Sequence, residues 1–392
     1  MEPTWYATNR SAFNSTSWCL NREDDLLTKV IKASGYLLVV VLSLIGNALV
    51  VWVIRSAYRM RTVTNYFITN VAFADLLTTV FNMMPTLFWI IERKDPWSVG
   101  GTLGEILCKT LQFFQCVSVA CSVFSMAAIS MDRFFAIFRP LKRIITFKLA
   151  KFIIALIWAS SCLISSPLIY ALKLEGDGED VNCVEVWAPL FDDYTSPMVY
   201  TIALFVLFYA LPLTIIAALY AVIMFRLWRR QTPGQNSTSN QSNKERTNKK
   251  VLKMLITVVA VFALCWLPLY VRMFLVFLQP SNFPCGLPYH LDFITLFLGH
   301  ANSSINPYLY VVFNENFRKG FKTIFKRRKP PPHLSSSRRR PGSTQVQKQG
   351  PSLSLMARQQ DSHYMRSCDV RTSFQGDIVI EERDLLKTDH VV

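Results

Sequence analysis

Histidine is scarce in this chain, and charged residues are scarce within its long apolar runs. The 392 residues include only five histidines, which form no cluster, so a membrane hydrolase with metal ligands or a nucleophile–base pair has no support. A transporter or channel is expected to carry several charges through its core, but Asp75 is the only clear charge of this kind. No internal repeat is visible either, which argues against paired-repeat transporters.

Acidic residues are outnumbered by basic ones, and the formal net charge is +16. In a soluble protein that imbalance would suggest a nucleic-acid partner. Here the basic residues fall between and after long apolar runs, and 51% of all residues are hydrophobic. This pattern is typical of a polytopic membrane protein with basic cytoplasmic faces, and it predicts no nucleic-acid partner.

Seven apolar runs are long enough to cross a bilayer, whose hydrocarbon core requires about 20 helical residues. Asp75 and Arg272 are the only charges within their runs, and the seventh run is polar but holds only the neutral-capable His300. The sequence therefore predicts an all-α membrane protein, with a bundle of seven transmembrane helices within residues 31–313. The runs cover residues 33–54, 66–91, 110–131, 152–172, 195–225, 254–273 and 293–313.

Basic residues also orient the predicted bundle, because cytoplasmic loops carry the excess of Lys and Arg. The segments after the first, third and fifth runs are basic, whereas the segment between the fourth and fifth runs holds seven acids and only Lys173. We therefore expect a multi-pass protein of the plasma membrane, with its N-terminus outside and its C-terminus in the cytoplasm. The outer tail, residues 1–30, carries glycosylation sequons at Asn9 and Asn14.

The segments on the cytoplasmic side are mostly polar. Residues 232–248 predict a linker without apolar periodicity. Residues 314–328 predict a short amphipathic helix that lies on the inner leaflet in contact with membrane lipids. Residues 329–392 predict a disordered cytoplasmic tail, in which serines 335–337 suggest a phosphorylated platform for receptor kinases and arrestin, a simple Ser-rich linker being the alternative.

Asp132 and Arg133 form an adjacent pair of opposite charge directly after the third run, within the stretch DRFFAIFRPL. In a seven-helix bundle with an outer N-terminus, this stretch resembles the DRY motif of rhodopsin-like G-protein-coupled receptors, with Phe134 where tyrosine is usual. Six further signatures of that family occur in the usual order across residues 30–326. They are GNALV at 46–50, NVAFAD at 70–75, Trp158, Pro212 with Tyr220, FALCWLP at 262–268 and NPYLY at 306–310.

The resemblance implies that Asp132, Arg133, Tyr220 and Tyr310 couple the protein to a heterotrimeric G protein. Arg133 would pair with Asp132 at rest and turn toward the G protein when the sixth helix moves outward. For the charge pair alone, an interfacial anchor is the simpler interpretation. The usual acid near the base of the sixth helix is missing, because RTNKKVLK supplies bases and Asn248 instead. The sequence thus offers no second lock on the resting state and allows raised basal signalling.

Asp75 is a carboxyl group in the middle of a membrane run, which is a costly placement. The resemblance implies an allosteric sodium ion bound by Asp75 and Ser122, near Asn302 and Ser303, that favours the inactive state. The alternative is a protonated Asp75 that shares hydrogen bonds in a helix-packing network. No other cofactor is expected.

Four cysteines are expected on the oxidising side of the membrane. The resemblance pairs Cys108 with Cys183. We also expect a bridge between Cys19 and Cys285, because helices one and seven are neighbours in this architecture and exposed free thiols are uncommon outside the cell. Two free thiols, or pairing with another chain, are the alternatives.

The third run has no acid where a receptor for amines would hold an ammonium group, and Gln115 stands there instead, after Gln112. Glutamine at this position resembles neuropeptide receptors of the neuropeptide Y, neuropeptide FF and orexin type. We therefore expect an extracellular peptide ligand. The expected ligand-binding residues are Gln112, Gln115, Cys116, Val119, Glu185, Trp266 and Tyr270.

The acidic segment between the fourth and fifth runs predicts a hairpin that attracts a cationic peptide, although a solvated acidic face is the simpler interpretation of the charges alone. A chemokine-like protein or a non-peptide ligand is the alternative to a peptide. A seven-helix transporter or a membrane enzyme is a remote alternative.

Overall fold

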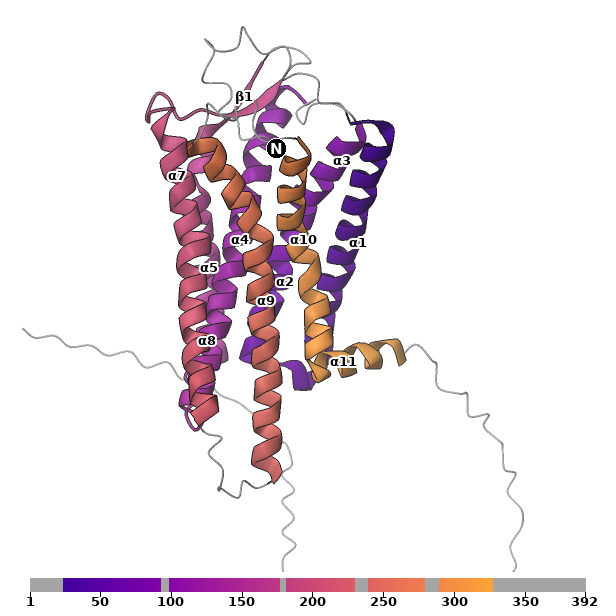
Figure 1. The fold of residues 1–392 in the computed structure, drawn as a ribbon, viewed down its shortest axis with the longest axis vertical. Helices are drawn as coiled ribbons and strands as arrows, with labels where there is room; N and C mark the ends of the chain where they lie inside the picture. Colours follow the sequence, from indigo (N-terminus) through magenta and orange to yellow (C-terminus); the bar gives the residue numbers. More distant parts are fainter. Residues whose placement is uncertain (1–23, 93–98, 177–180, 230–238, 279–288, 327–392) are drawn as a thin grey trace, which may run out of the picture. The chain divides into compact units, whose positions relative to one another are not determined.

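The computed structural model describes residues 24–92, 99–176, 181–229, 239–278 and 289–326. They belong to one compact unit and form a bundle of seven helical rods that run side by side (Figure 1). Six rods are long and apolar enough to cross a membrane. The seven-helix bundle that the sequence predicted is therefore confirmed within the described residues.

Four of the seven rods are single helices, and three are built from two or three consecutive helical segments. The single helices are α1 (Leu26–Ser56), α4 (Gly101–Phe138), α9 (Ser239–Leu278) and α10 (Tyr289–Phe313). The composite rods are α2 (Val63–Thr78), η4 (Thr79–Met83) and α3 (Met84–Glu92), then α5 (Phe147–Ser165) and α6 (Pro167–Ala171), then α7 (Thr195–Phe205), η5 (Val206–Ala210) and α8 (Leu211–Arg229). A short 3-10 turn, η3 (Tyr58–Met60), follows α1.

Prolines mark the divisions within the composite rods. Pro85 and Pro212 each follow a π-helical turn, η4 and η5, and Pro167 is the first residue of α6. Proline lacks a backbone N–H and clashes with the carbonyl four residues earlier, so the ladder of hydrogen bonds must rearrange beside it. Pro268 and Pro307 lie within α9 and α10, which continue past them.

Two rods begin with a threonine that caps the helix. The hydroxyl of Thr62 accepts a hydrogen bond from the backbone N–H of Asn65, and Thr146 accepts one from Leu149. A side-chain acceptor at this position satisfies a backbone donor that has no partner within the helix. The starts of α2 and α5 are therefore specified locally by the sequence.

The core lies around α4, which packs against α2, α5 and α8. The largest fully buried side chains include Tyr36, Phe67, Phe262 and Tyr310. By contrast, α9 packs mainly on α10 and touches α4 and α8 at few points. Large apolar side chains such as Leu163 remain exposed on the outer surface, as expected for a bundle whose outer face contacts lipid.

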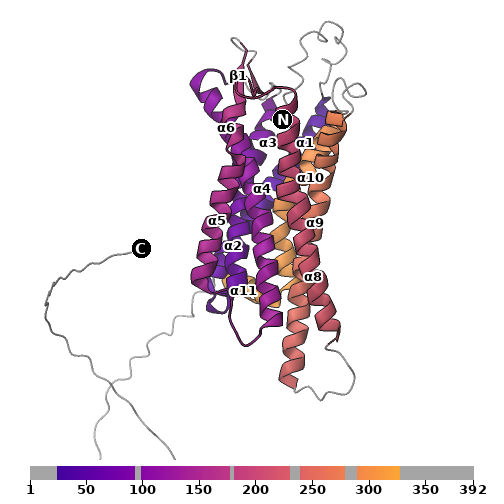
Figure 2. The same ribbon diagram turned by 90° about the vertical axis from the view of Figure 1, so that its left-hand side faces the viewer.

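A two-stranded sheet covers one end of the bundle, which we call the hairpin end. Strands β1 (Leu172–Glu175) and β2 (Asn182–Glu185) pair antiparallel, with Leu172 opposite Glu185. The hairpin predicted between the fourth and fifth runs is therefore present. Figure 2 shows it at one end, with α8 and α9 projecting at the other.

The last described element, α11 (Glu315–Lys326), runs across the opposite end of the bundle, which we call the α11 end (Figure 1). It lies within the range predicted for the amphipathic helix, and Phe317 is fully buried against the core. The prediction of a linker over residues 232–248 was wrong for residues 239–248, which belong to α9. An established helix extends readily, because each added residue gains a hydrogen bond without a new nucleus.

Candidate functional site

An acid–base pair lies at the α11 end of α4. The Nη2 atom of Arg133 is 2.6 Å from Oδ2 of Asp132. The same oxygen accepts a 2.6 Å hydrogen bond from the hydroxyl of Thr64 on α2. Asp132 is buried and Arg133 is partly buried, so a charged donor and a hydroxyl from another helix hold one carboxylate. Sequence reasoning missed Thr64, because its position opposite Asp132 depends on the alignment of two helices.

Two more hydrogen bonds continue this alignment of α2 and α4 toward the hairpin end. The side-chain amide of Asn70 donates to the hydroxyl of Ser125 at 2.9 Å. Further along, the hydroxyl of Thr78 donates to that of Ser118 at 2.8 Å. Trp158 of α5 donates to the free carbonyl of Asn70 at 2.9 Å and joins a third helix to the pair. These buried bonds fix the register of the two helices over most of their length.

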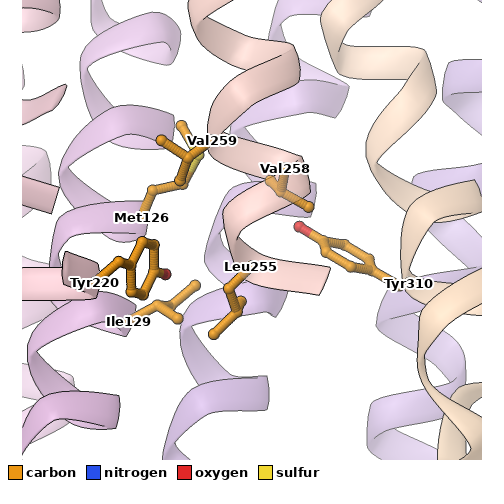
Figure 3. Close-up of a pocket in the computed structure, with 7 residues that line it drawn as sticks. All are labelled: Met126, Ile129, Tyr220, Leu255, Val258, Val259 and Tyr310. Atoms are coloured by element: carbon orange, nitrogen blue, oxygen red, sulfur yellow. The ribbon is translucent and has the colours of Figure 1, made fainter. Parts of the chain in front are cut away.

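A layer of apolar side chains separates the charge pair from the middle of the bundle. Tyr220 of α8 and Tyr310 of α10 are both buried and line one small pocket (Figure 3). Aliphatic residues of α4 and α9 line the rest of it: Met126, Ile129, Leu255, Val258 and Val259. The two tyrosines expected to take part in coupling therefore lie beside aliphatic side chains of α9, and this contact is made by apolar packing.

The buried carboxylate of Asp75 lies at the centre of a polar cluster. It accepts a hydrogen bond from Nδ2 of Asn306 at 3.0 Å, and Nδ2 of Asn47 donates to the backbone oxygen of Ser303 at 3.0 Å. Among the described residues, the Oδ1 atoms of Asn47, Asn302 and Asn306 are buried without a partner.

Ser122, Asn302 and Ser303, which the sequence analysis placed at a sodium site with Asp75, are all buried. A carboxylate with hydroxyl and carboxamide oxygens is a donor set that suits a hard cation, and unpartnered oxygens are what such an ion would use. The residues present therefore fit a sodium ion, which would add a positive charge beside Asp75.

Two buried carboxamides, one on η4 and one on α4, lie about one turn nearer the hairpin than the bond between Thr78 and Ser118. Asn82 of η4 is 0% exposed and Gln115 of α4 is 8% exposed. The rings of Phe81 and Phe114 are 4.5 Å apart, so the register of α2 and α4 continues to this level. Neither amide atom of Asn82 has a partner among the described residues, and Oε1 of Gln115 has none either. Unpaired buried polar groups are costly, which makes this level of the bundle suited to a polar ligand or to water.

The sequence from residue 46 to residue 310 matches the family model of the 7 transmembrane receptor (rhodopsin family). The chain belongs to this family. Curated relatives include the substance-P receptors of Cavia porcellus and Homo sapiens, each 33% identical over 297 residues, which are 76% of this chain and 71% of the relative. The tachykinin-like peptides receptor 99D of Drosophila melanogaster is 33% identical over 287 residues, 72% of this chain and 54% of the relative.

Family membership confirms the receptor class predicted from the sequence, and the chain is a membrane receptor and not an enzyme. The relatives carry the names of substance-P and tachykinin-like peptide receptors, whereas the sequence analysis named receptors of the neuropeptide Y, neuropeptide FF and orexin type. That narrower resemblance depended on one position, Gln115. One residue is not enough to choose among types within the family.

The other residues of the receptor expected to bind ligand lie on α4, α9 and β2. Gln112, Cys116 and Val119 lie on α4: Cys116 directly follows Gln115, and the other two lie about one turn before and after it. Trp266 is buried and packs beside Phe262, and its Nε1 has no partner within the described part of the chain. Tyr270 packs in an aromatic cluster with Phe205 and Tyr209, whose ring centroids lie 5.1 and 5.0 Å from its own. Sequence reasoning missed Asn82, whose signal was a lone carboxamide in the half of an apolar run that is nearer the hairpin.

A disulfide joins the hairpin of the receptor to α4. Cys108 and Cys183 are bonded, with their Cα atoms 5.6 Å apart. Glu185, two residues after Cys183, accepts a 2.7 Å hydrogen bond from Nε1 of Trp187, and burial raises the pKa of its carboxyl. Cys19, Cys285, Asn9 and Asn14 lie outside the described residues (Asn9, Asn14 and Cys19 in 1–23, Cys285 in 279–288).

Acids after β2 hold the shape of the segment that leads from the hairpin to α7. Asp193 accepts hydrogen bonds from the backbone N–H groups of Trp187 and Ala188. Asp192 accepts from the backbone and hydroxyl of Thr195 at 2.7 and 2.8 Å, and these bonds hold the pKa of Asp192 below its usual range. These acids, for which the sequence analysis offered attraction of a cationic ligand or a solvated face, thus also hold a turn and the first residue of α7.

Proposed function

We propose that this receptor sits in the plasma membrane with the hairpin end outside and α11 in the cytoplasm, binds an extracellular peptide and activates a heterotrimeric G protein. The single observation that carries the ligand class is that both amide atoms of Asn82 and Oε1 of Gln115 are buried without a partner among the described residues, at the level expected for ligand binding. The names of the relatives, which are receptors for substance P and for tachykinin-like peptides, support the same class.

The chemistry of the two carboxamides favours a neutral amide group on the ligand. Asn82 offers both a donor and an acceptor, and Gln115 offers an acceptor. A carboxylate has no donor for these acceptors, and an ammonium group would lack a compensating charge from either residue. A peptide with a C-terminal carboxamide satisfies all of these groups. The acids of the outer segment would attract a peptide that is also cationic.

A paired comparison of ligands tests this proposal. Peptides with a C-terminal carboxamide and the matching free acids would be applied to cells expressing the receptor, with calcium and cyclic AMP as readouts. We expect the amides to be the more potent agonists, and Asn82→Leu to remove about tenfold of that preference, because one buried polar contact is lost. Equal potency of amide and acid at the unchanged receptor would contradict amide recognition.

Coupling is assigned to Arg133 together with Tyr220 and Tyr310. The proposal is supported by the pair with Asp132, which neutralises Arg133 at rest, and by the apolar layer that α9 must leave before a G protein can reach it. Arg133→Ala should abolish agonist-stimulated nucleotide exchange while ligand binding and surface expression survive. Undiminished exchange in that variant would remove Arg133 from the coupling mechanism.

A sodium ion at Asp75 is proposed as a negative allosteric ligand. The carboxylate and the unpartnered oxygens around it support this assignment. Asp75→Asn should remove any difference in agonist affinity between sodium and a bulky organic cation at equal ionic strength. If the unchanged receptor has no such difference, the cluster is a packing network without an ion.

The division of the chain and its other partners also remain proposals: an outer tail (1–30), the receptor bundle (31–313), the amphipathic helix (314–328) and a cytoplasmic tail (329–392). Phe317 is buried against the bundle while Arg318 and Lys322 are exposed, which supports contact of α11 with lipid headgroups. Truncation after Lys329 should slow internalisation if kinases and arrestin act on the tail, and unchanged arrestin recruitment would contradict that role.

A bridge between Cys19 and Cys285 is proposed for the outer surface, beside glycans at Asn9 and Asn14. Support comes from the nearest described residues: Lys32 pairs with Asp24 at 2.8 Å and lies 4.9 Å from the ring centroid of Phe293, so the starts of α1 and α10 are adjacent. Mass spectrometry of a non-reduced digest decides it, since separately alkylated Cys19 and Cys285 would exclude the bridge.

A further inference from the structure

The α11 end of α9 is basic and is tied to α11 by an ion pair. The Nζ atom of Lys250 lies 2.5 Å from Oε1 of Glu315, although the two residues are 65 positions apart in the chain. One turn further along α9, the Nζ atom of Lys253 lies 5.9 Å from the ring centroid of Phe313. Residues 239–253 of α9 carry five basic residues and one acid, Glu245, so this end of the helix is complementary to an acid on a neighbouring segment.

Glu315 belongs to a segment that is fixed to the body of the bundle. Phe317 is fully buried, and its ring stacks on that of Tyr310 with centroids 5.7 Å apart. Gly320 lies so close to α1 that a Cβ atom there would be 2.6 Å from Cγ1 of Val53. Close contacts on both α10 and α1 leave α11 little freedom to follow a movement of α9.

Apart from the ion pair, the segment of α9 opposite Glu315 is held mainly by apolar packing, and Leu252, Met254 and Leu255 are buried in the core. This helix packs mainly on α10 and touches α4 and α8 at few points, chiefly through aliphatic side chains such as Leu255 and Val258. Aliphatic contacts are not directional, so they resist a sideways movement less specifically than a hydrogen-bonded ion pair does. A displacement of the α11 end of α9 away from the bundle would separate Lys250 from Glu315.

We propose that Lys250 and Glu315 form a latch that holds α9 against the bundle in the resting receptor, in the role of the acid that is missing from the base of this helix. The proposal rests on the G-protein coupling proposed above, because release of the latch is the movement that exposes Arg133. The latch would supply the second lock on the resting state that the sequence did not offer.

The surroundings of Glu315 make the latch reversible. Lys250, by its hydrogen bond and its charge, holds the pKa of Glu315 below its usual range, so the carboxyl stays ionised. Arg318 and Lys319 are three and four positions later on the same helix, which is the favourable spacing for an acid that precedes a base. When Lys250 leaves, these two cations can pair with Glu315, and the carboxylate is not left uncompensated.

Charge reversal and its repair test the latch. The purified receptor in nanodiscs would carry Lys250→Glu, Glu315→Lys or both, with Lys322→Glu as the control for reversing an exposed cation of the same cluster. Hydrogen–deuterium exchange over the α11 end of α9, without G protein, reports release of the helix. Basal nucleotide exchange on added G protein reports its consequence.

We expect each single reversal to raise both rates about two- to fivefold, which is the range for an exposed ion pair, and the double reversal to restore them. The latch would be overturned if the single reversals changed the two rates no more than Lys322→Glu does. It would also be overturned if the rates of the double variant equalled the sum of the two single effects, without any return toward the parent. If no variant activates G protein even with agonist, the coupling proposal fails, while the hydrogen-exchange result still decides whether the latch exists.

Discussion

The two ends of α9 are both tied to the segments that follow it, but in different surroundings. At the hairpin end, Nε of Arg272 lies 2.6 Å from Oδ1 of Asp292 on α10, and the two side chains are 9% and 14% exposed. At the α11 end, Lys250 and Glu315 are 2.5 Å apart, and their side chains are 47% and 48% exposed. The two ion pairs therefore have similar lengths, but they differ in how strongly they resist separation.

Burial decides the difference. Removing one partner of a buried ion pair leaves an uncompensated charge, which costs about 3–5 kcal/mol. An exposed pair is solvated before and after it opens, so it contributes little and opens easily. The hairpin end of α9 is therefore suited to act as a pivot, and the α11 end is suited to swing. Pro268, with Trp266 one half-turn earlier, lies between the two and interrupts the helix ladder there.

The largest expected effect comes from breaking the buried pair. Arg272→Ala or Asp292→Asn should destabilise the purified receptor by about 3–5 kcal/mol, because the remaining charge loses its partner. Thermal unfolding in detergent measures this, with Lys250→Ala as the control at the other end. If Lys250→Ala destabilised the receptor as much as Arg272→Ala does, burial would not explain the difference between the two ends of α9.

A smaller effect is expected from moving the fixed side of the latch. Gly320→Ala places a Cβ atom where Val53 already lies, and overpacking of this kind costs about 1–3 kcal/mol. Gly35→Ala is the matched control, because its Cβ would be 3.7 Å from Phe297, an ordinary contact. Both changes replace a helical glycine by alanine and so raise helix propensity equally. Any difference in stability between the two variants therefore reports the packing of α11.

Displacement of α11 should also carry Glu315 away from Lys250. We therefore expect Gly320→Ala to raise basal nucleotide exchange, and Gly35→Ala to leave it unchanged. A destabilised Gly320→Ala receptor with unaltered basal exchange would indicate that α11 need not be fixed for α9 to stay in place.

The positions of most helices can be predicted from the local sequence, whereas the hydrogen bonds and ion pairs between helices cannot. Run length and charge specify the seven helices, and family signatures identify Asp132 with Arg133 and Cys108 with Cys183. Glu315 and Thr64 could not be assigned, since each acts through a partner on a distant segment. The same holds for Asn82, whose facing residue depends on the register set by hydrogen bonds between α2 and α4. The start of α9 was misplaced because a polar stretch extends a helix that apolar packing has already formed.

The smallest effect is expected from a change in salt concentration, which should weaken the exposed ion pair and leave the buried one unchanged. Raising choline chloride from about 50 mM to about 500 mM shortens the range of exposed charges and avoids any change in sodium. Hydrogen exchange at the α11 end of α9 should rise up to about fivefold, while exchange beside the buried Arg272 stays constant. Lys250→Gln should abolish the salt response, because no pair remains to be screened. Equal responses at both ends, or a response that persists in Lys250→Gln, would mean that packing and not the exposed pair holds the swinging end of α9.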